Sequence, residues 1–278
     1  MITLDEAKEL GKGYKVVPIS KEFLSDIRTP IEVLRILKGV SRHCYMLESV
    51  EHQERWGRYT FLGYDPKMEI TCMNGSLTIR NGSTKTKTVE HPGEGIKELL
   101  KEYTSPKVEG LPTFTGGLVG YFSYDYVKYS EPKLNLDAED TEGFKDVDLM
   151  LFDKVIAFDN LRQKIIVIAN ARMEDIEAEY TRCTAEIGEI IKLIREGVPT
   201  PIEPGRITSD FRALFSEKEY CAMVEKAKKY IYEGDIFQVV LSNRLEADYE
   251  GSLLNTYRHL RTINPSPYMF YFSSDDME

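Results

Sequence analysis

Two separate stretches of the sequence combine residue types that could bind a small polar molecule. In the first, Glu48 and Ser49 end an apolar run, and Arg58 and Tyr59 open the next one. A carboxylate and a hydroxyl at such strand ends could hold the ammonium and carboxylate of an amino acid, because a buried charge needs a partner. The alternative is a solvent-facing strand end, and the residue types alone favour that alternative.

The second stretch runs from Asn264 to Phe270 and places two prolines before Tyr268 and Met269. Proline fixes the backbone φ angle, while methionine adapts its shape to an apolar neighbour. The combination suits a slot for a flat ring. An ordinary connection from a helix to a strand would have the same composition and is the more common case.

Other candidate motifs give neither a catalytic nor a metal site. The glycines of residues 116–120 lack the Lys-Ser/Thr of a phosphate loop, so we interpret them as positions of close backbone approach within a sheet. The cysteines form no CxxC pair and have no histidine at metal-ligand spacing, and the acidic runs at 137–142 and 275–278 are interpreted as solvated faces. The cysteines are Cys44, Cys72, Cys183 and Cys221, and the histidines are His43, His52, His91 and His259.

Composition indicates a globular protein and excludes several classes. The 278 residues are 42% apolar and 29% charged, which does not fit disorder, collagen or a coiled coil. The net charge of -10 disfavours nucleic acid as a partner. The apolar runs are too short to span a bilayer and the N-terminus lacks a signal core, so we expect a cytoplasmic protein without membrane association.

The elements that must position these residues alternate between hairpins and helices. Asn-Gly at 74–75 and 81–82 predicts a three-stranded antiparallel meander over 69–89, because a type I′ turn needs two positive φ angles. Apolar spacing predicts a long helix over 172–196. Further strands are expected at 44–51, 58–66, 149–159, 164–170, 236–248 and 268–272, and further helices at 30–38, 93–104 and 253–263.

A proline-rich segment at 199–206 is the best domain boundary in the chain. Ser216 and Glu219 then form a capping box at the start of the next helix. The strand at 268–272 is unusually apolar for one with only six residues after it, so we expect the chain to be a fragment of a larger sheet protein.

Four stretches in a fixed order resemble anthranilate synthase component I, one of the chorismate-utilising enzymes. Together they extend over most of the chain, and the ordered set is more specific than any single match. The stretches are LESVE (47–51) with RYTFLGYDP (58–66), GGLVGYFSYDYVKYSEP (116–132), GDIFQVVLSNR (234–244) and NPSPYMFYF (264–272).

The resemblance implies a truncated α+β fold with antiparallel sheets and helices packed outside. Residues 1–200 would be the N-terminal domain and 201–278 the start of the chorismate-binding domain. The whole enzyme would be a lyase that converts chorismate and ammonia to anthranilate and pyruvate in tryptophan biosynthesis. A glutamine amidotransferase subunit would supply the ammonia. The Mg²⁺ ligands and catalytic residues would lie beyond residue 278, so the resemblance implies no catalytic or metal residue here and an inactive fragment.

The resemblance also implies an allosteric site for L-tryptophan that mediates feedback inhibition. Glu48 would pair the ligand ammonium and Ser49 would hydrogen-bond a polar group of the ligand. Arg58 aligns loosely with a basic residue of that site. The indole would lie against the second stretch, at Pro267, Tyr268 and Met269.

Two rival functions remain open at this point. The closest is component I of aminodeoxychorismate synthase, which serves the folate pathway, although NPSPYM favours anthranilate synthase. The other is a non-catalytic regulatory module that binds tryptophan.

Overall fold

The computed structural model describes the chain except for residues 50–56, 132, 135–139 and 141, and it divides into two compact units. Unit 1 comprises Met1–Pro201 together with Leu260–Glu278, and unit 2 comprises Ile202–His259. The division after Pro201 falls within the proline-rich segment. The last 19 residues belong to unit 1. Unit 2 therefore ends at His259, whereas the predicted second domain runs from residue 201 to residue 278.

A six-stranded antiparallel sheet, here called sheet A, forms the centre of unit 1. Its strand order is β1-β10-β9-β3-β2-β15, so the last strand of the chain lies beside β2. The strands are β1 (Val16–Leu24), β2 (Cys44–Glu48), β3 (Tyr59–Tyr64), β9 (Lys154–Asp159), β10 (Lys164–Arg172) and β15 (Met269–Ser273).

A second antiparallel sheet, sheet B, contains the expected meander in the order β6-β5-β4-β8-β7. Asn74 and Gly75 both have positive φ, as the type I′ prediction requires. At Gly120 the φ angle is 151°, and an added Cβ would lie 2.0 Å from the carbonyl oxygen of Asp148, so close backbone approach explains this glycine. The strands are β4 (Met68–Met73), β5 (Ser76–Asn81), β6 (Ser83–Thr88), β7 (Gly117–Phe122) and β8 (Val147–Phe152).

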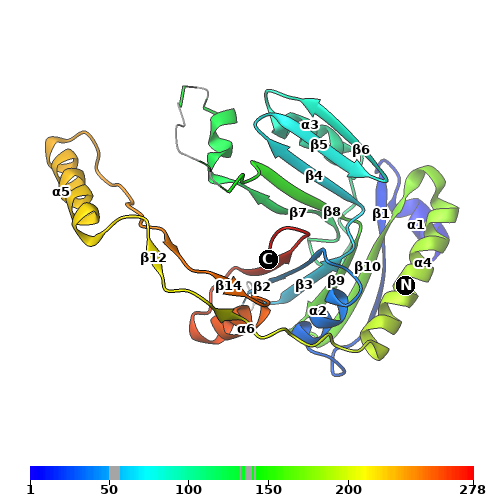
Figure 1. Cartoon of the computed structure of the whole chain (residues 1–278). Coiled ribbons are helices and arrows are strands. Elements are labelled where there is room, and N and C mark those ends of the chain that lie inside the picture. Colours follow the sequence, from blue (N-terminus) through cyan, green and yellow to red (C-terminus); the bar gives the residue numbers. More distant parts are fainter. Residues whose placement is uncertain (50–56, 132, 135–139, 141) are drawn as a thin grey trace. The chain divides into compact units, whose positions relative to one another are not determined.

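The two sheets and their helices form four layers (Figure 1). Tyr45 of sheet A and Phe152 of sheet B meet edge to face between the sheets, with ring centroids 4.7 Å apart. The far face of sheet B packs against α3, and the far face of sheet A packs against α1, α2 and α4. The helices are α1 (Leu4–Leu10), α2 (Pro30–Lys38), α3 (Pro92–Lys101) and α4 (Ile176–Glu196), with 3₁₀ turns η1 (Tyr124–Tyr129) and η2 (Met173–Asp175).

The predicted strand over 149–159 is wrong, because two strands in different sheets share that run. β8 ends at Phe152 in sheet B, and β9 begins at Lys154 in sheet A. Every residue of both strands is buried, so the apolar pattern continues across the change of sheet at Asp153.

Unit 2 contains α5 (Glu217–Glu233), which begins with the predicted capping box at Ser216 and ends at Gly234 with φ 85°. The predicted strand over 236–248 is wrong. Only β13 (Leu245–Glu246) of that range is a strand, and it pairs with β12 (Arg212–Ala213). The unit also holds β11 (Arg206–Ile207) and β14 (Tyr249–Glu250), and α6 (Leu254–Ile263) crosses from unit 2 into the returning segment of unit 1.

The described residues confirm the expected α+β class, with antiparallel sheets and helices packed outside. None of the helices in the described part of the chain is long and apolar enough to cross a membrane.

Candidate functional site

The two stretches singled out by sequence lie side by side in sheet A. β15 pairs antiparallel with β2, and Met269 is directly opposite Glu48 in that register. Ser49 follows Glu48 at the end of β2. Residues more than two hundred positions apart therefore line one corner of the sheet, and both stretches belong to unit 1.

Glu48 is held by a cation of the chain itself. Its side chain is 3% exposed, and the Arg261 guanidinium lies against it with Nε 2.6 Å from Oε1. Nη2 of Arg261 donates to Oε2 at 2.8 Å, so both carboxylate oxygens face the fork of one arginine. Only the Nη2 contact is aligned as a hydrogen bond: Nε lies close to Oε1 but is buried without a hydrogen-bond acceptor among the described residues. A ligand ammonium at Glu48 would meet a site that already contains a positive charge.

Ser49 presents a buried hydroxyl that no described residue hydrogen-bonds. Its Oγ is inaccessible to solvent and has no hydrogen-bond partner among the residues that the structure describes. A buried hydroxyl without a partner costs free energy, and a ligand polar group could relieve that cost. Because side chains alternate along a strand, Tyr45 and Leu47 face sheet B while Glu48 faces the helices. Continuation of this alternation would place Ser49 on the side of sheet B, so a ligand that reaches both Glu48 and Ser49 would have to bind at the end of β2, where the two faces of the sheet meet.

The proline-containing stretch contributes one buried and one open side chain. Met269 is buried beside Glu48, and Pro267 is half-buried. Tyr268 is 72% exposed, so its side chain lies at the surface of this corner. Phe270 also is mostly exposed. The corner therefore offers an exposed aromatic face next to a buried thioether, which suits a planar apolar group.

Arg58, the loosely aligned basic residue, is bound to the neighbouring strand β9. Its Nη2 lies 2.8 Å and its Nε 3.2 Å from the carboxylate oxygens of Asp159, whose side chain is fully buried. Burial alone raises the pKa of Asp159, but the bonds from Arg58 and the backbone N–H of Arg162 outweigh burial and hold that pKa below its usual range. Arg58 thus has a structural partner at the start of β3.

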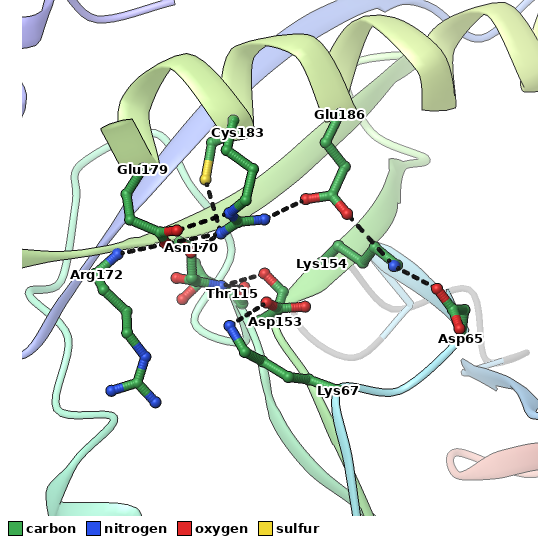
Figure 2. Close-up of polar contacts among 11 residues, drawn as sticks. Asp65, Lys67, Thr115, Asp153, Lys154, Asn170, Arg172, Glu179, Cys183 and Glu186 are labelled. Atoms are coloured by element: carbon green, nitrogen blue, oxygen red, sulfur yellow. Dashed lines mark hydrogen bonds and ion pairs between the residues drawn. The ribbon is translucent and has the colours of Figure 1, made fainter. Parts of the chain in front are cut away.

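A second polar network fastens α4 to sheet A and offers no free site (Figure 2). Arg182 of α4 is bound by Glu179 and Glu186 of the same helix, and Glu186 also reaches Lys154 of β9 at 3.4 Å. Asp65 accepts from the Lys154 Nζ at 3.0 Å. Burial alone lowers the pKa of Lys154, yet the bond to Asp65 and the charge of Glu186 outweigh it and raise that pKa. Each of these charged groups contacts at least one group of opposite charge, so we interpret the network as structural.

Three potential metal ligands meet elsewhere in unit 1. His43 Nε2 lies 3.1 Å from a carboxylate oxygen of Glu69 and 3.6 Å from one of Asp275. Arg80 is paired with Glu69 and Arg42 with Asp275, so two cations already balance the two carboxylates. This cluster could not be predicted from the sequence, because its members lie far apart in the chain.

Arg261 is the site residue that sequence reasoning missed. It lies in the predicted helix over 253–263, three residues before Asn264 begins the proline-containing stretch. An arginine on an amphipathic helix is normally a surface residue. The only available signal was Glu48 itself: had this carboxylate been predicted to be buried, it would have required a cation within the protein whenever no ligand is bound.

Known proteins match this chain along most of its length. Residues 42–278 match the model of the chorismate-binding enzymes. Anthranilate synthase component 1 of Acinetobacter calcoaceticus is 36% identical over 97% of this chain and 55% of its own length. The protein of that name from Acetivibrio thermocellus is 35% identical over 97% and 56%.

A solved structure supports the same assignment. Anthranilate synthase component I from Streptococcus pneumoniae TIGR4 superposes with a TM-score of 0.62 at 27% identity, covering 87% of this chain and 52% of that chain. The chain thus spans about half the length of the relatives it matches. Because the family model covers residues 42–278, the chain belongs to the family of chorismate-binding enzymes.

Proposed function

We propose that this chain is part of an anthranilate synthase component I, the subunit that converts chorismate and ammonia to anthranilate and pyruvate. The names of its relatives support this proposal over the folate-pathway alternative. A glutamine amidotransferase would be the partner that supplies ammonia. Since the chain spans about half of each relative, we propose that these 278 residues alone produce no anthranilate from chorismate, Mg²⁺ and an ammonium salt.

Magnesium belongs to this proposal only through the resemblance. Mg²⁺ prefers an octahedron of oxygen ligands. The described cluster of His43, Glu69 and Asp275 does not fit that preference, because it includes an imidazole and its carboxylates are paired with arginines. No described residue is therefore assigned to the metal.

For the part of the molecule in hand, we propose an L-tryptophan site at the corner formed by β2 and β15. The register that places Met269 opposite Glu48 is the observation that carries this proposal. Ser49, whose hydroxyl has no partner among the described residues, would hydrogen-bond a polar group of the ligand, and Tyr268 would cover the indole.

Three other residues have narrower proposed roles at this site. Glu48 would pair the ammonium, Pro267 and Met269 would form the apolar wall, and Arg58 would keep the start of β3 in place through Asp159. The proposed role of this site is to bind a ligand, since its described residues include no nucleophile paired with a base.

Calorimetric titration of L-tryptophan into the chain tests this function. Ser49→Ala should weaken binding about fivefold, because a lost hydrogen bond costs about 1 kcal/mol. Ser123→Ala is the matched control, since its Oγ is also buried without a described partner but lies at the end of β7, and it should leave the affinity unchanged. Absence of binding at millimolar tryptophan would contradict the proposal.

A further inference from the structure

The Glu48–Arg261 pair bears on how the proposed site distinguishes an amino acid from other indoles. A carboxylate that is 3% exposed cannot stay charged without a nearby cation. In this structure Arg261 provides that cation, and its guanidinium covers both oxygens. A ligand ammonium that approached the Glu48 carboxylate would therefore meet the positive charge of Arg261 at the same two oxygens. Two cations that contact one carboxylate lie close enough to repel each other.

We propose that Arg261 is an internal competitor for the ammonium position, and that an amino-acid ligand binds by displacing its guanidinium from Glu48. This inference rests on the proposed tryptophan site and deepens it. The Arg261 side chain is 28% exposed, so the displaced guanidinium has a route into solvent. Glu48 stays in place because β2 lies between β3 and β15 in sheet A.

The position of Arg261 in the chain gives the exchange a structural consequence. Arg261 lies in the last turn of α6, and the chain continues from there to the Pro267–Met269 wall. Releasing the guanidinium removes the ion pair between Arg261 of α6 and Glu48 of β2. Ligand binding would thus loosen the C-terminal turn of α6 while it fills the corner beside β15.

Competition predicts a specific change in ligand discrimination. In the natural chain the binding free energy from the contact between the ligand ammonium and Glu48 is offset by the loss of the ion pair between Arg261 and Glu48. Tryptophan should therefore bind only slightly better than indole-3-propionate, which has the same ring and carboxylate but no ammonium. In Arg261→Gln the ammonium would no longer have to displace a guanidinium from Glu48, and the preference for tryptophan over indole-3-propionate should rise at least about tenfold.

Arg182→Gln is the matched control for this variant. It removes another partly exposed arginine from its carboxylates in unit 1, at α4. Its thermal stability should fall as that of Arg261→Gln does, but its preference between the two ligands should not change. A purely structural Arg261 would behave like this control, and an unchanged or smaller preference in Arg261→Gln overturns the inference. Absence of tryptophan binding to any of these proteins would instead remove the proposed site itself.

A measurement on the natural chain does not depend on whether a variant folds. Hydrogen–deuterium exchange of a peptide over residues 257–263 should become faster at saturating L-tryptophan, because the turn that holds Arg261 loses its ion pair. The same peptide should be unaffected by indole-3-propionate. Slower or unchanged exchange with tryptophan, in a sample that calorimetry shows to be saturated, would overturn the displacement.

Discussion

Replacing Arg58 by glutamine separates a structural role from a ligand-binding role for this residue. The guanidinium makes two bonds to Asp159, whose side chain is fully buried, while 34% of the Arg58 side chain is exposed. Removing one partner of a fully buried pair costs about 3–5 kcal/mol. Because solvent screens the exposed third of Arg58, we expect a loss of about 2 kcal/mol in the free energy of unfolding.

Thermal and urea unfolding of a double-mutant cycle measure this interaction. For a domain of about 150–250 residues the expected loss lowers the melting temperature by about 4–8 °C. Arg58→Gln, Asp159→Asn and the double variant should give a coupling energy of about 1–2 kcal/mol. Arg206→Gln is the control, because its pair with Glu250 is exposed on both sides and its removal should leave the midpoint unchanged.

The pH dependence of the Arg58 effect has a defined sign. The pKa of Asp159 lies below its usual range in the folded protein, so the pair stabilises the fold above the ordinary carboxyl pKa. This stabilisation is lost as the pH falls through the lowered value. The difference between the natural chain and Arg58→Gln should therefore shrink in strong acid. Additive single effects at pH 7, or a difference that grows in acid, would refute the reasoning.

Two further predictions concern packing and thiol chemistry. Gly120→Ala should lower the free energy of unfolding by at least about 2 kcal/mol in urea titration, because its Cβ would overlap a carbonyl oxygen. Gly188→Ala, on the open face of α4, is the control and should be neutral or stabilising. Equal effects of the two substitutions would show that the close approach at Gly120 is absent. Burial raises the pKa of Cys44 and Cys183 to about 12, whereas Cys221 is exposed. Peptide mass spectrometry should therefore show that N-ethylmaleimide at pH 8 modifies Cys221 long before the other two. Comparable labelling of all three in the folded chain would contradict the buried positions.

Features fixed by local chemistry could be predicted from the sequence. The turn at Asn74 and Gly75 needs only its own two residues to adopt positive φ, and the capping box at Ser216 needs only the next three residues. Both are present as expected. The helix over 176–196 likewise follows from a single apolar face.

Features that depend on distant partners could not be predicted. The change of sheet at Asp153 leaves no mark in an apolar run, because β8 and β9 are both completely buried and each is completed by strands from elsewhere in the chain. The run over 236–248 has strand-forming residues, but no strand of the described part lies beside most of it, so only Leu245–Glu246 pairs. Propensity without a partner does not make a strand.

The candidate site also combines features that could be predicted from the sequence with a feature that depends on a distant partner. The residue types of Glu48 and Ser49 and of the proline-containing stretch could be singled out from the sequence, and the register of β15 on β2 brings them together. The Arg261 pair could not be foreseen, because an arginine on a helix reveals nothing about which carboxylate it meets. The ion pair between Arg261 and Glu48 could therefore be identified only from the structure.

The methyl resonance of Met269 tests the central claim most directly. With ¹³C-methyl methionine in the chain, an indole against the β15 wall should shift the Met269 signal through its ring current, in a saturable titration with L-tryptophan. Met150, buried between the sheets, is the internal reference and should not move. A Met269 signal that stays in place while calorimetry reports saturation would show that tryptophan binds elsewhere and would contradict the account.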